Sequence, residues 1–268
     1  MIQDESLGVS GSAPDEEPDH LAKGRMTIWE HLAEFRMRLI RCVLAIVIGM
    51  VLGFFLYPYI LEFLKQPYAE LTGRTDFIAL DPLEPFATRL KISAYVGIVF
   101  AMPVLLWQIW RFVTPGLYPH EKRYAVPFVV SALLLFVFGA SIAYITLNPA
   151  LQFLQQMGAG QVTSFYTVDN YVTLIAYMML AFGVGFEFPV LLVALQIAGV
   201  LTPRKLLGWW RQALVIIAIV AAVITPSGDP ISMMALAVPM YIFYGLSIVI
   251  GVFITRGKRK ATAGQANA

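Results

Sequence analysis

Long, continuously apolar segments alternate with short polar connections along most of this chain. A hydrocarbon core of about 30 Å needs roughly 20 apolar residues for one helical crossing. Six segments approach or meet that length, at residues 40–57, 91–111, 124–147, 170–198, 212–225 and 231–254. They lack the alternation of apolar and polar residues that is typical of a membrane β-barrel strand. The pattern therefore predicts an all-α membrane protein with six transmembrane helices.

A shorter amphipathic pattern precedes the first apolar segment. Apolar residues recur at helical spacing from Ile28 to Leu39, and charged residues occupy the opposite face. This predicts a short amphipathic helix before the first span. Its Glu34 stands one turn before Arg38, a spacing that allows an ion pair worth about 0.2–0.5 kcal/mol. On this segment alone, the simplest interpretation is that Glu34 pairs with Arg38 and that the arginines orient the chain.

The basic residues are distributed unevenly between the two sides that six spans define. Of the 19 Lys and Arg residues, all but Lys65, Arg74, Arg89 and Lys91 fall on the side that carries both termini. The positive-inside rule predicts that this side is cytoplasmic. The net charge of +2 therefore indicates orientation at a membrane surface and carries no sign of nucleic-acid binding.

The two ends of the chain differ in composition from the apolar segments. Residues 1–25 are rich in Gly, Ser, Pro and acidic residues and are expected to form a disordered cytoplasmic tail. They also lack the basic start and apolar core of a cleavable signal peptide. Residues 26–255 are expected to form the membrane domain. Residues 256–268 are expected to form a basic cytoplasmic tail, also without structure.

The connections expected on the outer side are unequal. Residues 58–90 contain four prolines and are expected to fold as short helices over the outer end of the bundle. In the connection of residues 148–169, Pro149 is expected in the first turn of a separate surface helix. The last connection, from Thr225 to Pro230, is expected to be a tight turn.

The fifth apolar segment is short. Only about 14 uncharged residues lie between Arg211 and Pro226, roughly 21 Å of helix. A short span that is exposed to lipid thins the bilayer or recruits a partner helix. We therefore expect contact with a partner at this span. The alternative is that neighbouring uncharged residues such as Trp209 complete the crossing.

Glu187 lies deep in the fourth apolar segment. About 12 residues, roughly 18 Å of helix, separate it from the cytoplasmic end near Gly199. Ionisable residues at this depth face a bundle interior or an aqueous cavity and commonly mark function. We therefore interpret Glu187 as an intramembrane functional residue. The alternative is a neutral acid that bonds to a neighbouring helix, beside a kink introduced by Pro189.

Enzyme, metal and nucleotide chemistry find little support in the sequence. His31 and Glu34 have the i, i+3 spacing of metal ligands, but a second pair is missing, and the only other histidines are His20 and His120. No Gly-rich phosphate loop followed by Lys-Ser or Lys-Thr is present. Cys42 is the only cysteine, so an intrachain disulfide is impossible. We therefore expect no catalytic residue, no cofactor and no bound metal.

Four motifs, taken together and in this order, resemble the TatC family, the six-span receptor subunits of the twin-arginine protein translocase. They are HLAEFRMRL from His31, FVTPGLYPHEKR from Phe112, FGVGFEFPV from Phe182, and TPSGDPIS from Thr225 followed by AVPMYIFY. The resemblance extends from about Trp29 to Phe253.

The resemblance implies a membrane receptor that binds twin-arginine signal peptides of folded cargo proteins at its cytoplasmic face. It also implies assembly with single-span TatA- and TatB-type subunits, self-association in the receptor complex, and transport driven by the proton-motive force. The implied location is the cytoplasmic membrane of a prokaryote.

The signal-peptide-contacting acids of the family fall on Glu34 and Glu121, with Phe112 in the same recognition surface. The chemistry fits this assignment, because a guanidinium presents a planar fork that a carboxylate accepts with two hydrogen bonds. Two adjacent arginines therefore require two acceptors, and Glu34 and Glu121 would supply them.

The resemblance assigns three further positions. The intramembrane polar position of the family falls on Glu187, and outer-loop functional positions fall on Pro67 and Asp229. The chain departs from many relatives at Met233 and Gly245, where Gln and Glu are common and are implicated in partner contact.

Two other functions compete with the receptor. An ion-coupled small-solute transporter could use Glu187 as its proton site, but such transporters usually contain repeated halves, and Glu187 has no counterpart in the first three spans. An intramembrane enzyme would need a nucleophile and base, and the sequence offers no credible pair. The receptor is therefore the favoured interpretation, with the transporter as the alternative.

Overall fold

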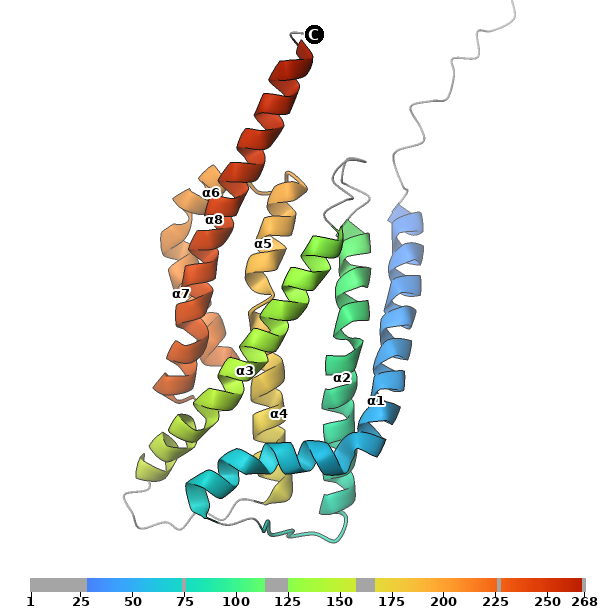
Figure 1. The fold of residues 1–268 in the computed structure, drawn as a ribbon, viewed down its shortest axis with the longest axis vertical. Coiled ribbons are helices and arrows are strands. Elements are labelled where there is room, and N and C mark those ends of the chain that lie inside the picture. Colours follow the sequence, from blue (N-terminus) through green and yellow to red (C-terminus); the bar gives the residue numbers. More distant parts are fainter. Residues whose placement is uncertain (1–27, 74–75, 114–124, 158–166, 226–227, 267–268) are drawn as a thin grey trace, which may run out of the picture. The chain divides into compact units, whose positions relative to one another are not determined.

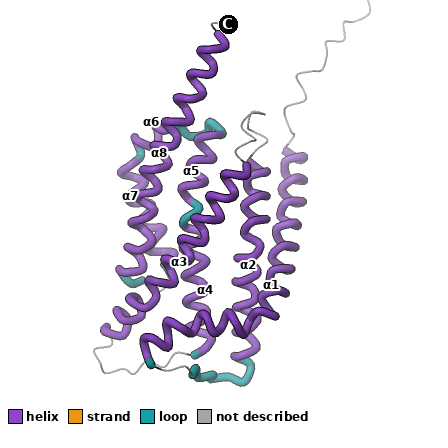
Figure 2. Tube along the Cα trace, viewed as in Figure 1, coloured by secondary structure: helices purple, strands orange, loops and turns teal. Residues whose placement is uncertain are grey.

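The computed structural model describes residues 28–73, 76–113, 125–157, 167–225 and 228–266, and these residues are almost entirely helical (Figures 1 and 2). The helices are α1 (Ile28–Thr72), α2 (Glu84–Val113), α3 (Ala125–Met157), α4 (Val168–Gly185), α5 (Phe188–Ile197), α6 (Pro203–Gly208), α7 (Trp210–Ile224) and α8 (Pro230–Ala266). Within these residues the β-type pairing is a single isolated bridge between Ile78 and Thr167. The predicted all-α class is confirmed.

Five helical segments of the described residues are long and apolar enough to cross a membrane. They are Leu32–Thr72, Glu84–Phe112, Val126–Met157, Val168–Ile197 and Pro230–Ile254. The shorter apolar helix α7 has 15 residues, or about 22 Å of length. This agrees with the prediction of a short fifth apolar segment.

The chain divides into two compact units, Met1–Leu39 and Ile40–Ala268. The described residues of the first unit, 28–39, form the beginning of α1. The second unit contains the remainder of α1 and the helices α2 to α8.

Helix α1 is continuous where the sequence predicted separate elements. The amphipathic segment is not a helix of its own, because α1 begins at Ile28 and includes both that segment and the first apolar segment. The helix also continues to Thr72, through Pro58 and Pro67. The prediction of separate short helices in this part of the outer connection was therefore wrong.

Two other helix ends differ from prediction. Helix α3 passes through Pro149 to Met157, so the predicted separate surface helix is instead the end of α3. Helix α8 extends to Ala266, so most of the tail expected to be unstructured is helical. In both places the helix continues beyond the apolar residues that marked it in the sequence.

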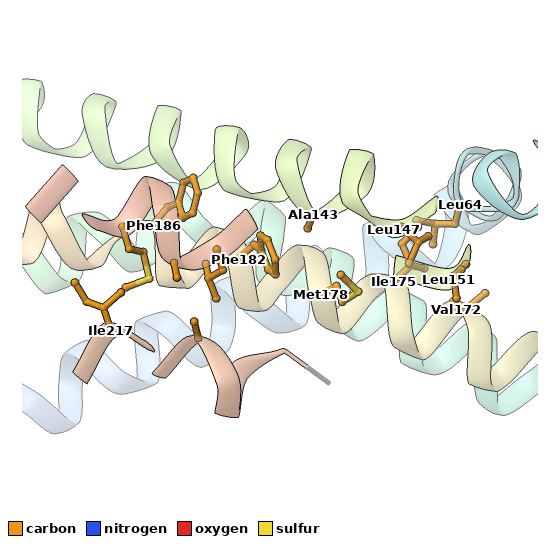
Figure 3. Close-up of a cluster of buried hydrophobic side chains, with 14 of the residues drawn as sticks. Leu64, Ala143, Leu147, Leu151, Val172, Ile175, Met178, Phe182, Phe186 and Ile217 are labelled. Carbon is orange, nitrogen blue, oxygen red and sulfur yellow. The ribbon is translucent and has the colours of Figure 1, made fainter. Parts of the chain in front are cut away.

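The core of the second unit is built around α4, which packs against α2 and α3, while α8 packs against α3, α5 and α7. Figure 3 shows side chains from several of these helices meeting along α4. The buried members include Leu147 and Leu151 of α3, Ile175, Met178 and Phe182 of α4, and Ile217 of α7.

Small residues allow neighbouring helices to approach closely. A Cβ atom added at Gly49 would lie 2.6 Å from the main-chain oxygen of Gly97, and one added at Gly139 would lie 2.7 Å from that of Phe182. Such contacts are typical of helix pairs in membranes, where close packing contributes to association. Glycine at these positions sets the spacing of α1 against α2 and of α3 against α4.

Polar contacts join the beginnings of α2 and α4. Lys91 Nζ lies 2.7 Å from Asp169 Oδ2, and the main-chain N–H of Asp169 donates to Glu84 Oε1 at 3.2 Å. The bridge between Ile78 and Thr167 lies just before these two helices. These contacts fix the two helices to each other at one end.

Candidate functional site

Glu34 lies in the first unit and pairs with Arg38, as the i, i+4 spacing predicted. The Arg38 guanidinium donates from Nη2 to Glu34 Oε1. The second carboxylate oxygen, Oε2, receives no hydrogen bond from any residue that the structure describes. One oxygen of this acid is therefore engaged, and the other can accept a further donor.

Of the other two residues of the predicted recognition surface, the structure describes only Phe112. Phe112 is half-buried in the last turn of α2, next to Arg111. Glu121 lies outside the described residues, as does most of its motif. Glu34 and Phe112 belong to different units. The expected grouping of Glu34, Phe112 and Glu121 therefore stays a prediction.

Glu187 lies at a break between α4 and α5. Helix α4 ends at Gly185, and Glu187 is the N-cap residue of α5. Its N–H donates to the Val184 carbonyl at 3.1 Å, and its own carbonyl accepts from Leu191 N at 3.0 Å. Pro189 has no N–H and is favoured in the first turn of a helix, which explains a new helix start here. The sequence predicted a kink at this proline, and the structure has instead a break between α4 and α5 just before it.

The Glu187 side chain lines a cavity of about 530 Å³ between α2, α5 and α7. The other described residues that line it have uncharged side chains, such as Met102, Leu191 and Val220. Glu187 Oε1 is buried and receives no hydrogen bond from the described part of the chain. A buried polar atom without a partner is costly, so this carboxyl would gain from a polar group that entered the cavity.

Pro67 and Asp229, both expected in outer loops, have clear structural environments. Pro67 is buried inside α1 and does not lie in a loop. Asp229 is 1% exposed and directly precedes Pro230, the first residue of α8. Its Oδ1 accepts from the N–H of Ser232 at 2.7 Å, the arrangement of a helix N-cap. The predicted tight turn beside it includes residues 226–227, which lie outside the described residues.

Arg89 and Tyr144, to which the sequence assigned no structural role, both contact α1. Each donates a hydrogen bond to a main-chain carbonyl of α1, at Phe54 and Phe63 respectively. No motif marks these donors in the sequence. The available signal was the pair of prolines in α1, since each leaves one carbonyl of the helix without its normal N–H donor.

The model of the family described as Sec-independent protein translocase protein (TatC) matches residues 30–239 of the chain. This chain belongs to the TatC family. The matched range contains the segments of Glu34, Phe112, Glu121, Glu187 and Asp229.

Curated TatC proteins are similar along most of this chain. The TatC of Aquifex aeolicus (strain VF5) is 39% identical over 238 residues, covering 88% of this chain and 98% of its own length. The TatC of Deinococcus radiodurans is 36% identical over 228 residues, covering 83% of this chain and 84% of its own length.

Crystal structures show the same fold. A structure of the twin-arginine translocase receptor TatC has a TM-score of 0.71 and 39% identity, and the match covers 84% of this chain and 100% of that one. A second structure of that receptor, in DDM, has a TM-score of 0.72.

Membership in the TatC family confirms the resemblance found in the sequence motifs. It shows that the chain is a multi-helix membrane protein related to components of a Sec-independent protein translocase. The TatC family is not a known family of catalytic enzymes, and membership in it does not favour the small-solute transporter.

Proposed function

We propose that this chain is the membrane receptor of a twin-arginine translocation system and binds the signal peptides of folded cargo proteins at its cytoplasmic face. The observation that carries the proposal is the TatC match over residues 30–239. The similar crystal structures, which are of a twin-arginine translocase receptor, support it.

The proposed topology has six membrane crossings. They are the first apolar segment in α1, then α2, α3, α4 with α5, α7, and α8. Both termini then lie in the cytoplasm, with residues 1–25 and 256–268 as tails of a membrane domain at 26–255. The distribution of Lys and Arg supports this orientation, and the bacterial relatives support placement in a prokaryotic cytoplasmic membrane.

In the proposed recognition step, Glu34 and Glu121 each accept one arginine of the signal peptide, and Phe112 contacts its apolar part. The unengaged Oε2 of Glu34 supports this role, since it can accept one guanidinium N–H, and Oε1 keeps a second lone pair beside its bond to Arg38 for the other N–H. A lysine pair would bind less well, because an ammonium group cannot form the same two-pronged contact.

Photo-crosslinking of the purified chain to a twin-arginine signal peptide tests this step. Removing one charge-assisted hydrogen bond costs about 1.5–3 kcal/mol, so Glu34→Gln and Glu121→Gln should each weaken labelling about tenfold or more. A twin-lysine peptide should show a similar loss. Glu62→Gln is the matched control, because Glu62 is an exposed acid elsewhere on α1. Equal labelling of every variant by both peptides would refute the acid pair.

After recognition, the receptor is proposed to associate with further copies of itself and with single-span TatA- and TatB-type subunits. The short helix α7 is the proposed contact for a single-span subunit. Val215, Ile219 and Val223 of α7 are all more than half exposed, whereas Ile217 and Ala221 are buried. Transport is proposed to depend on the proton-motive force and on Glu187, which faces an apolar cavity large enough to admit a partner's side chains.

A further inference from the structure

Two prolines inside α1 each remove one hydrogen bond from the helix. Helical N–H groups donate to the carbonyl four residues earlier. Pro58 and Pro67 have no N–H, so the carbonyls of Phe54 and Phe63 lose their normal donors. Where water cannot reach it, such a carbonyl is costly unless another group satisfies it.

Arg89 of α2 supplies the donor at the first of these positions. Its Nη2 lies 3.0 Å from the carbonyl oxygen of Phe54. The guanidinium carbon lies 4.0 Å from the centre of the Phe54 ring and 5.2 Å from that of Tyr57. The side chain thus bonds to the carbonyl that Pro58 releases and packs on the ring of the same residue.

Tyr144 of α3 makes the corresponding contact at the second position. Its hydroxyl donates to the carbonyl oxygen of Phe63 at 3.0 Å. Its ring stacks on the ring of Phe63, with centroids 4.5 Å apart and planes inclined by 12°. The hydroxyl of Tyr171 on α4 donates to the neighbouring Leu64 carbonyl at 3.0 Å. Each of the two carbonyls that lose their helical donors in α1 therefore accepts a hydrogen bond from a side chain of another helix.

We propose that Arg89 and Tyr144 are positioning residues that fix the direction of the arm of α1, defined as residues 58–72. In Figure 1 the arm turns away from the preceding part of α1 and runs across the end of the bundle. The arm places Leu64 and Tyr68 in the core, where the Tyr68 and Tyr171 rings lie 5.3 Å apart. Pro58 and Pro67 permit the arm to turn, and Arg89 and Tyr144 hold it in one direction.

A double-mutant cycle on the full-length chain in detergent tests the Tyr144 contact. Tyr144→Phe keeps the stacked ring and removes only the hydroxyl, which also lies 3.4 Å from Gln66 Oε1, so Tm should fall by about 3 °C. In a Pro67→Ala background the new N–H can donate to the Phe63 carbonyl, so the same change should lower Tm by less than about 1 °C. Equal losses in the two backgrounds would overturn the proposal.

Tyr241→Phe is the matched control. The Tyr241 hydroxyl donates to the Leu214 carbonyl at 3.0 Å. That carbonyl is not released by a proline, because the residue four positions later is Ala218, which has an N–H. The loss of Tm caused by Tyr241→Phe should therefore be the same in the native background and in the Pro67→Ala background. A cycle of Arg89→Met with Pro58→Ala tests the other position in the same way. Coupling is expected there too, and strict additivity would contradict the role of Arg89.

Spin-label distances report the direction of the arm itself. In a Cys42→Ala background, labels at Glu62→Cys on the arm and Leu83→Cys before α2 occupy exposed positions. One narrow distance distribution is expected, which Tyr144→Phe and Arg89→Met should broaden and Tyr241→Phe should leave unchanged. These measurements need no signal peptide, so they are independent of the receptor function. An unbroadened distribution in both donor variants would show that the arm is held by other contacts.

Discussion

Polar side chains in this molecule differ in whether the fold provides hydrogen-bond partners for their buried atoms. Asp229 is buried and accepts the Ser232 N–H at the start of α8, so the fold accounts for it. Glu187 has a buried oxygen without a described partner, in a cavity lined otherwise by uncharged residues. The structure thus gives Asp229 a structural role and leaves Glu187 available for another one.

Glu187→Gln should reduce transport about tenfold or more while leaving signal-peptide crosslinking unchanged. The amide keeps the size of the side chain but cannot ionise, and its contact with an entering polar group would be weaker by about 1.5 kcal/mol or more. Transport of a folded reporter into membrane vesicles measures the first effect, and photo-crosslinking measures the second. A normal transport rate would favour a packing role for Glu187.

Asp229→Ala should lower the stability of the chain by about 1 kcal/mol, because it removes the cap of α8. Thermal unfolding in detergent should then show a Tm lower by about 2–4 °C. Asp229→Asn retains an oxygen that can cap the helix and should restore most of this loss. An equal loss in both variants would contradict capping, since asparagine is as good a cap as aspartate.

At the scale of elements, the sequence predicted which segments are apolar better than it predicted where helices end. Residues 58–90, with their four prolines, were expected to form short helices, and Pro149 was expected to begin a helix, yet α1 continues through Pro58 and Pro67 and α3 continues through Pro149. A helix can continue through a proline where another group donates to the carbonyl that the proline releases, as Arg89 and Tyr144 do for Pro58 and Pro67. Arg89 and Tyr144 are distant in sequence from the prolines they compensate, so one-dimensional patterns could not identify them.

Helix α7 should crosslink to a single-span partner from its exposed face. Cysteines at Ile219 and Val223, which are 56% and 76% exposed, should form disulfides with cysteines in the partner's apolar segment. Ala221→Cys is the buried control on the same helix, and Val137→Cys is an exposed control on α3. A short helix gains more from a covering partner than a full-length one. Equal crosslinking from α3 and α7 would contradict a specific contact at α7.

At the scale of the whole molecule, hydrophobicity was sufficient to predict an all-helical membrane protein, and four motifs were sufficient to suggest its family. The candidate site was harder to predict from the sequence. Glu34 was expected to pair with Arg38 and does so, but the sequence could not show that a second oxygen stays unengaged. The Glu187 cavity also depends on packing between α2, α5 and α7, helices that are far apart along the chain.

The polar contacts between Lys91, Asp169 and Glu84 have a mechanical consequence. They join α2 and α4 at one end, while the far half of α2 faces α5 and α7 across the Glu187 cavity. Helix α2 has 30 residues and is about 45 Å long. A helix that is fixed at one end converts a small tilt about this pivot into a larger displacement at its other end. A tilt of about 5° at the pivot would displace the other end by about 4 Å, enough to change the width of the cavity while the pivot stays intact.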